Sequence, residues 1–125
     1  MNYRAMEAKN NILRERTFAF AIRCINLYRY LVEEKKEFVI SKQMLRAGTS
    51  IGANYREAQN AESTNDFIHK LGIAQKECDE TMYWLEILQA AYLLDQNTFD
   101  SIYKDASEIL KMIKSSILTT KQKQA

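Results

Sequence analysis

Proline is absent from this sequence of 125 residues, and glycine occurs only three times. Turn-rich β proteins use both residues freely, because proline and glycine supply the backbone angles that tight turns require. Their scarcity argues against such a fold and favours long helices with few interruptions. The length suits a single domain, and an apolar fraction of 46% is sufficient to build one hydrophobic core.

A long hydrophobic run and a secretory leader are also missing. The most apolar segment, residues 87–94, is far shorter than the ~20 residues that cross a bilayer. Residues 1–11 are charged and contain no apolar stretch, so they do not resemble a signal peptide. The two cysteines, Cys24 and Cys78, lack the CxxC spacing of metal and redox sites. We expect both to be reduced thiols in the core of a cytoplasmic protein.

Histidine occurs once, as His69, which leaves few ways to build an active site. A di-iron centre in a helical bundle requires two Glu-x-x-His motifs, and His69 has only Asp66 three residues before it. No Ser-His-Asp set, phosphate-binding loop or dinucleotide fingerprint is present, and no base accompanies Ser50 or Cys78. We expect no catalytic residues, no metal, no cofactor and no small-molecule substrate.

Four segments with apolar residues every three to four positions predict four helices. They span about residues 11–32, 42–62, 66–94 and 98–120, with a frayed tail at residues 121–125. The expected apolar stripe of the first helix consists of Phe18, Ile22, Ile25, Tyr28 and Val32. Because the connections are short, consecutive helices run antiparallel, which predicts an all-α, up-down-up-down four-helix bundle.

Local signals indicate where the helices start and where two of them can approach closely. Ser41 is the expected N-cap of the second helix, and Asn97 or Thr98 that of the fourth. Gly48 and Gly52, four residues apart on the second helix, leave room for a neighbouring helix.

Polar residues follow the apolar stripes of the second and third helices at helical spacing. They are Arg46, Ser50, Asn54 and Glu57 on the second helix and Lys70, Glu77, Glu80 and Trp84 on the third. A hairpin that turns at residues 63–65 predicts the pairs Arg46–Glu80, Ser50–Glu77 and Glu57–Lys70. We interpret this set, the polar lock, as fixing the register of the two helices. The competing interpretation takes its three glutamates as the paired carboxylates of an active site.

Basic residues gather towards the two ends of the sequence. Residues 1–32 hold six Lys and Arg against two acids, residues 104–125 hold five against two, and residues 33–103 hold seven against twelve. The candidate nucleic-acid contacts are Arg14, Arg16, Arg23, Arg29, Lys104, Lys111, Lys114, Lys121 and Lys123. Such an excess is typical of a phosphate-binding surface, although an ordinary solvated face is the simpler interpretation.

Residues 43–58 read QMLRAGTSIGANYREA, and residues 66–71 and 76–85 read DFIHKL and KECDETMYWL. This combination resembles the bacterial four-helix-bundle family named after the 23S ribosomal RNA intervening-sequence protein, over about residues 15–120. Some members are encoded within insertions of 23S rRNA genes. The resemblance implies an up-down bundle that assembles as a homopentameric ring, RNA binding inferred from gene context, and no established catalytic residues. All residues of the polar lock except Lys70 match the family motif, which is not an active site.

Two functional hypotheses follow. The first is a non-enzymatic, oligomeric protein that binds ribosomal or other structured RNA through charge and shape. The alternative is a homo-oligomeric scaffold for protein interactions with no nucleic-acid role, in which Tyr83 or Trp84 anchors an interface. An enzyme is the least favoured reading, and we expect no membrane partner.

Overall fold

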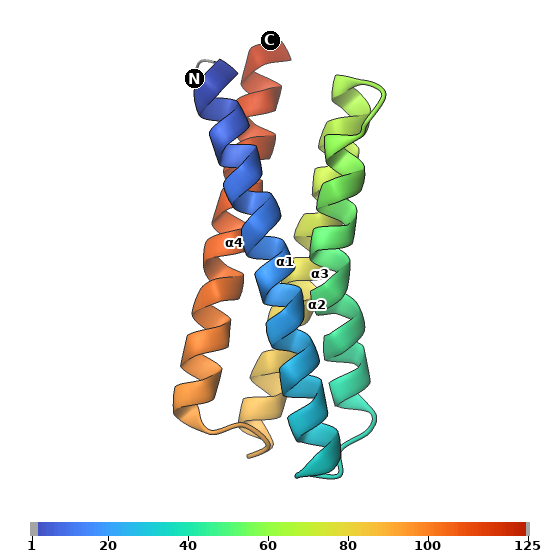
Figure 1. Ribbon diagram of the computed structural model, residues 1–125, viewed down its shortest axis with the longest axis vertical. Helices are drawn as coiled ribbons and strands as arrows, with labels where there is room; N and C mark the ends of the chain where they lie inside the picture. The colour runs from blue at the N-terminus through green and yellow to red at the C-terminus, as the bar shows by residue number, and fades with distance from the viewer. Residues whose placement is uncertain (1–2, 125) are drawn as a thin grey trace.

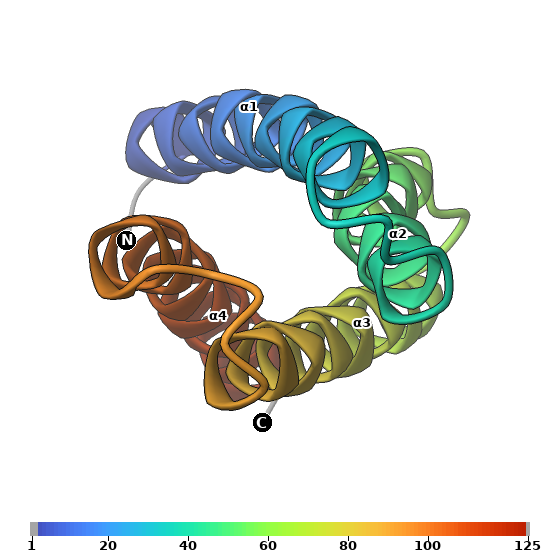
Figure 2. The same cartoon turned by 90° about the horizontal axis from the view of Figure 1, so that it is seen from below.

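The computed structural model describes residues 3–124 and consists of four long helices. These are α1 (Tyr3–Glu33), α2 (Ile40–Gln59), α3 (Thr64–Ala90) and α4 (Gln96–Gln124). The helices alternate in direction, so that α1 begins and α4 ends at the same end of the molecule (Figure 1). Viewed along the bundle, each helix lies beside the next one in sequence (Figure 2). The all-α class is confirmed, since residues 3–124 contain no strand.

Several helix ends differ from the sequence expectation, and the second helix ends at Gln59 and not near residue 62. The first helix begins at Tyr3 and not near residue 11, while α4 continues to Gln124, so no frayed tail starts at residue 121. Residues 1, 2 and 125 lie outside the described part of the chain. The third helix ends at Ala90 and not near residue 94, because Tyr92 takes a left-handed φ of 63°. This conformation reverses the chain and is typical of helix C-termini.

Two of the expected N-caps are wrong. Ser41 lies inside α2, and the side chain that caps the free backbone N–H groups at the start of this helix is that of Glu37. Its carboxylate accepts hydrogen bonds from the backbone nitrogens of Val39, Ile40 and Ser41 at 2.6–3.0 Å. At α4 the capping side chain is Asp95, which accepts from the Thr98 backbone nitrogen at 2.8 Å. Acidic side chains at these positions also interact favourably with the helix dipole.

The expected apolar stripe of α1 is wrong at Phe18 and Ile22, although Tyr28, which is also expected in it, packs against the core. Phe18 and Ile22 are 56% and 43% exposed, whereas Phe20 and Cys24 are almost fully buried. The inward face of α1 consists of Leu13, Thr17, Phe20, Cys24, Leu27 and Leu31. Both cysteines are unpaired and buried in the core, as expected. Because Phe18 and Ile22 face away from the core, α1 presents an apolar strip to solvent.

The helices are not packed equally tightly. Gly48 and Gly52 bring α2 against α1, where a Cβ on Gly52 would lie 3.3 Å from the Thr17 hydroxyl. The close approach expected from these glycines is therefore present. The α1–α4 pair has the sparsest packing of the four adjacent pairs.

Candidate functional site

The polar lock is formed at one end of its expected length. The Nη2 of Arg46 donates to the Glu80 carboxylate at 2.6 Å, which joins α2 to α3. The same guanidinium lies 3.8 Å from Glu77, whose side chain is 20% exposed. Arg46 therefore neutralises two carboxylates on successive turns of α3.

The central pair of the polar lock is not formed. The Ser50 hydroxyl donates to the Arg46 carbonyl at 2.6 Å, one turn earlier on its own helix, and no hydrogen bond within residues 3–124 joins it to Glu77. Asn54 likewise donates to the Ser50 carbonyl at 2.8 Å. Short polar side chains inside helices commonly bond to the preceding turn in this way. Both residues therefore satisfy their own helix and do not bridge to α3.

Glu57 and Lys70 do not form the expected ion pair, since the ion pairs within 4.0 Å in the described chain do not include them. Glu57 is exposed, and both side chains line an open polar pocket of about 390 Å³ at the α2–α3 turn. Solvent screens charges in such a position, so a pair there would contribute little to stability.

Two buried polar atoms on the lock face of α3 have no hydrogen-bond partner within the described chain. They are the Oε2 of Glu77 and the indole nitrogen of Trp84. The Trp84 ring packs on the edge of the core and lies 5.1 Å from the ring of Tyr83 between centroids. Tyr83 is 56% exposed. Of the two adjacent aromatic residues, Trp84 thus belongs to the bundle and Tyr83 faces solvent.

The candidate nucleic-acid contacts fall into two groups. The arginines of α1 hold the bundle together: Arg16 bonds to Glu108, and Arg23 bonds to Asp105 at 2.7 Å, both on α4. Arg14 donates to Gln59 of α2 at 2.8 Å. Of these four candidate contacts on α1, only Arg29 is exposed and makes no ion pair within residues 3–124. The first helix therefore contributes less to a basic surface than its sequence indicated.

The lysines of α4 form the second group. Lys104, Lys111, Lys114 and Lys121 are exposed, and no ion pair within the described residues involves them. Lys123 is exposed at the end of the helix. At 1.5 Å per residue, Lys104 and Lys121 lie about 25 Å apart along α4. Of the three acids of α4, Asp105 and Glu108 turn towards α1, whereas Asp100 is exposed one turn before Lys104. The outer face is therefore basic from Lys104 to the end of the helix.

The described residues offer no arrangement for nucleophilic or metal chemistry. Burial raises the pKa of the Cys24 and Cys78 thiols to about 12, which keeps them protonated and unreactive at neutral pH. No group of three or more potential His, Cys, Asp or Glu metal ligands occurs among residues 3–124. Within the same range, no helix has the length and apolar character needed to span a membrane.

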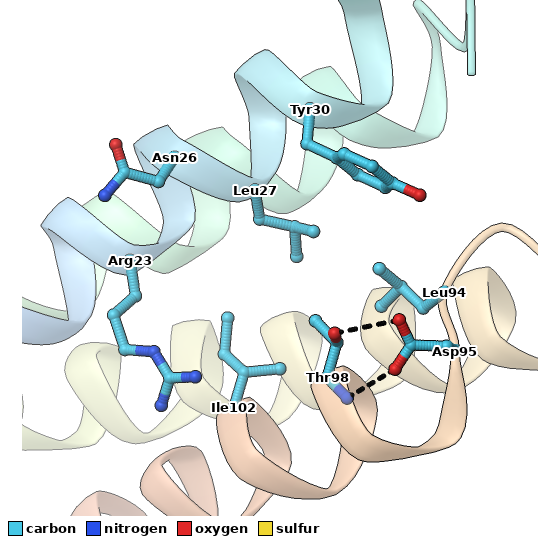
Figure 3. A pocket seen from close by; sticks show the side chains of 8 residues that line it. All are labelled: Arg23, Asn26, Leu27, Tyr30, Leu94, Asp95, Thr98 and Ile102. Atoms are coloured by element: carbon cyan, nitrogen blue, oxygen red, sulfur yellow. Dashed lines mark hydrogen bonds between the residues drawn. The ribbon is translucent and has the colours of Figure 1, made fainter. Parts of the chain in front are cut away.

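A pocket that the sequence did not indicate lies between α1 and α4 (Figure 3). It measures about 340 Å³ and is lined by Arg23, Asn26, Leu27, Tyr30, Leu94, Asp95, Thr98 and Ile102. These positions carry no motif, because they come from two helices and a connection that are distant in sequence.

Comparison with known proteins identifies related sequences. A family model described as "23S rRNA-intervening sequence protein" matches residues 9–115. The chain is also similar to a solved structure from Bacteroides thetaiotaomicron VPI-5482, described as a protein with unknown function from the S23 ribosomal protein family. The two share 51% identity and a TM-score of 0.86, over 87% of this chain and 97% of the other. No curated protein matches the chain.

Proposed function

Because the chain belongs to the 23S rRNA-intervening sequence protein family, we propose that it binds structured RNA and acts without catalysis. The observation that supports this most directly is the outer face of α4. Lys104, Lys111, Lys114 and Lys121 stand along it with no acidic partner in the described chain. When exposed lysines that make no ion pair contact the phosphates of a nucleic acid, they displace the counterions bound there, and the release of these ions favours binding.

The mode of recognition follows from what the bundle presents. Sequence-specific RNA binding uses aromatic platforms on which unpaired bases stack. The exposed aromatic residues here, Phe18, Phe38, Tyr83 and Tyr92 among them, are spread over two helices and two connections. We therefore propose recognition of the RNA backbone and its shape, with little dependence on base sequence.

A salt-dependent filter-binding titration tests the proposal. With a structured fragment of 23S rRNA, affinity is expected to fall steeply as salt rises. The double variant Lys104→Glu/Lys111→Glu should weaken binding and reduce the slope of log K against log salt by about 2, one for each lost phosphate contact.

The matched control is Lys42→Glu/Lys76→Glu, which changes the net charge equally but on α2 and α3. Both of these lysines are exposed, so folding should be unaffected in either double variant. Absence of binding by the wild type at low salt would reject RNA binding. An equal loss in both double variants would show that overall charge and not the α4 face is responsible.

A second candidate function is a homo-oligomeric scaffold, which we propose on the basis of the exposed strip on α1. Phe18 and Ile22 lie one turn apart and are 56% and 43% exposed. Neighbouring exposed apolar side chains are typical of surfaces that another chain covers. The family resemblance favours a ring of five copies of the 14.6 kDa chain.

Light scattering coupled to size-exclusion chromatography measures the assembly directly. The wild type should elute as an oligomer, and Phe18→Glu/Ile22→Glu should dissociate it while circular dichroism remains helical. If the wild type is monomeric at micromolar concentration, the proposal of a ring is rejected. An oligomer that survives the double variant would place the interface elsewhere.

A further inference from the structure

The pocket between α1 and α4 has the size and lining of a small-molecule site. Ligand pockets usually enclose about 300–1,000 Å³ and combine apolar walls with a few polar groups. This pocket measures about 340 Å³ and lies where α1 and α4 diverge. In Figure 3, Leu27 and Tyr30 extend from α1 towards α4, while Thr98 and Ile102 face them from below.

The walls of the pocket are apolar. Leu27, Leu94 and Ile102 are at most 7% exposed and form its floor. Leu94 reaches this position because the left-handed turn at Tyr92 ends α3 and directs the chain back over the core. The space above these three side chains lacks protein atoms, so a flat apolar group entering it gains contacts that the bundle itself does not make.

The polar groups stand at opposite ends. At one end, the Arg23 guanidinium bonds to Asp105 at 2.7 Å and to the Ser101 hydroxyl at 2.9 Å, so its charge is already neutralised. At the other end, the Asp95 carboxylate accepts two hydrogen bonds, both from Thr98, at 2.8 and 3.1 Å. No cation within the described residues lies within 4.0 Å of Asp95.

The charge of Asp95 is therefore available to a ligand. A carboxylate has about four acceptor positions, of which Thr98 occupies two. The hydrogen bonds from Thr98 lower the pKa of Asp95, with smaller contributions from the Asn97 backbone and from the charge of Lys35, so the group is ionised at neutral pH. The pocket as a whole offers an apolar floor and, at its rim, one negative charge that makes no ion pair within the described residues.

We propose that this pocket binds a small molecule with a flat apolar body and an ammonium group. The apolar body lies on Leu27, Leu94 and Ile102, and the ammonium donates to Asp95. This inference is independent of RNA binding, because the lysines of the outer α4 face do not line the pocket.

Residue-resolved NMR of the full chain tests the proposal with phenethylamine as the probe. Saturable shifts are expected at the backbone amides of Leu27, Tyr30, Leu94 and Thr98. The neutral 2-phenylethanol should bind about three- to fivefold more weakly, since an exposed charge pair contributes up to about that factor. The anionic 3-phenylpropionate should bind more weakly still.

The variant Asp95→Asn tests whether the charge of Asp95 is needed for binding, without changing the fold. Asparagine is as good an N-cap as aspartate, so the start of α4 should be kept, while the preference for the amine over the alcohol is expected to disappear. The matched control is Asp100→Asn, which removes an exposed acid one turn further along α4 that does not line the pocket. It should retain the preference.

Three results would overturn the proposal: no saturable shifts with 10 mM phenethylamine, shifts that map away from the pocket, or equal affinity of the wild type for the amine and the alcohol.

Discussion

Gly48 lies so close to Cys24 that no side chain fits between α2 and α1 at this point. A Cβ built on Gly48 would overlap the Cys24 sulfur and lie 3.2 Å from its Cβ. Cys24 is fully buried and has no free direction in which to move. Glycine inside a helix normally costs about 1 kcal/mol relative to alanine, so the close approach of the two helices is the reason for its presence.

The first prediction concerns this contact. Gly48→Ala should lower the free energy of unfolding by about 1–3 kcal/mol, because overpacking outweighs the gain in helix propensity. Gly72→Ala is the matched control on α3, where an added Cβ meets nothing within 4 Å. It should raise stability by about 0.5–1 kcal/mol. Urea unfolding measures both, and changes of the same sign would contradict the explanation.

A second prediction concerns the three charges of the polar lock that do meet. Glu80→Gln removes an exposed partner of Arg46 and should cost less than about 1 kcal/mol. Arg46→Gln leaves Glu77 half-buried with no compensating charge and should cost about 1–3 kcal/mol.

The double variant Arg46→Gln/Glu77→Gln distinguishes the two effects. It should recover part of the loss, because the stranded carboxylate is then gone. Chemical unfolding of the wild type, Arg46→Gln, Glu77→Gln and the double variant completes the cycle. If the double variant is no more stable than Arg46→Gln, the carboxylate is not the cause.

A third prediction is a pH dependence that originates at Glu37. Partial burial acts to raise the pKa of this carboxyl, but the hydrogen bonds from Ser41, Val39 and Ile40 outweigh it, so the pKa is lowered from 4.5. A lowered pKa in the folded state means that the stabilisation is complete above pH 4.5 and is lost as the pH falls through the folded value.

Glu37→Gln should therefore cost about 0.5–2 kcal/mol at pH 7, as the loss of a helix cap does. Below pH 4.5 the difference from the wild type should shrink, because the wild type loses the same interaction. Thermal unfolding from pH 7 to pH 3 measures this. The matched control is Glu34→Gln, at an exposed position in the same connection that makes none of these hydrogen bonds to α2.

The fourth prediction is that neither thiol reacts in the native state. Cys24 and Cys78 are fully buried, and burial raises their pKa to about 12. A thiol reagent such as dithiobis(nitrobenzoate) should modify both only as fast as the protein unfolds at pH 8, and within seconds in denaturant. Rapid labelling of the native protein would show that the core opens far more readily than its packing indicates.

The number of helices and their amphipathic character could be predicted from spacing alone, but the inward face of α1 could not. That helix has two apolar stripes, and the one that contains Phe18 and Ile22 is as hydrophobic as the one that contains Phe20 and Cys24. The buried stripe even includes a polar residue, Thr17. Which stripe is buried depends on α2, since Gly52 leaves space for the Thr17 side chain and Gly48 for that of Cys24.

The polar contacts between α2 and α3 could be predicted from the sequence only where a side chain is long enough to reach the other helix. Arg46 is long enough to contact α3, whereas the Ser50 hydroxyl finds an acceptor on its own helix. The caps were missed for different reasons. Glu37 caps α2 from two residues before the N-cap position, which local capping rules do not favour. Asp95 stands in the ordinary N-cap position of α4, and it was missed because the start of that helix was expected two residues too late. The α1–α4 pocket depends on how far two helices diverge, which no residue encodes by itself.

The sparse packing between α1 and α4 has a consequence for how the chain folds. Three of the four helix pairs that pack in the described chain are neighbours in sequence, and only α1 with α4 joins its two ends. Most native contacts therefore close short loops, and such chains fold within microseconds to milliseconds. The pairing of α1 with α4 closes the longest segment of chain and forms the fewest contacts. In hydrogen exchange, this pair should open first and α2–α3 last.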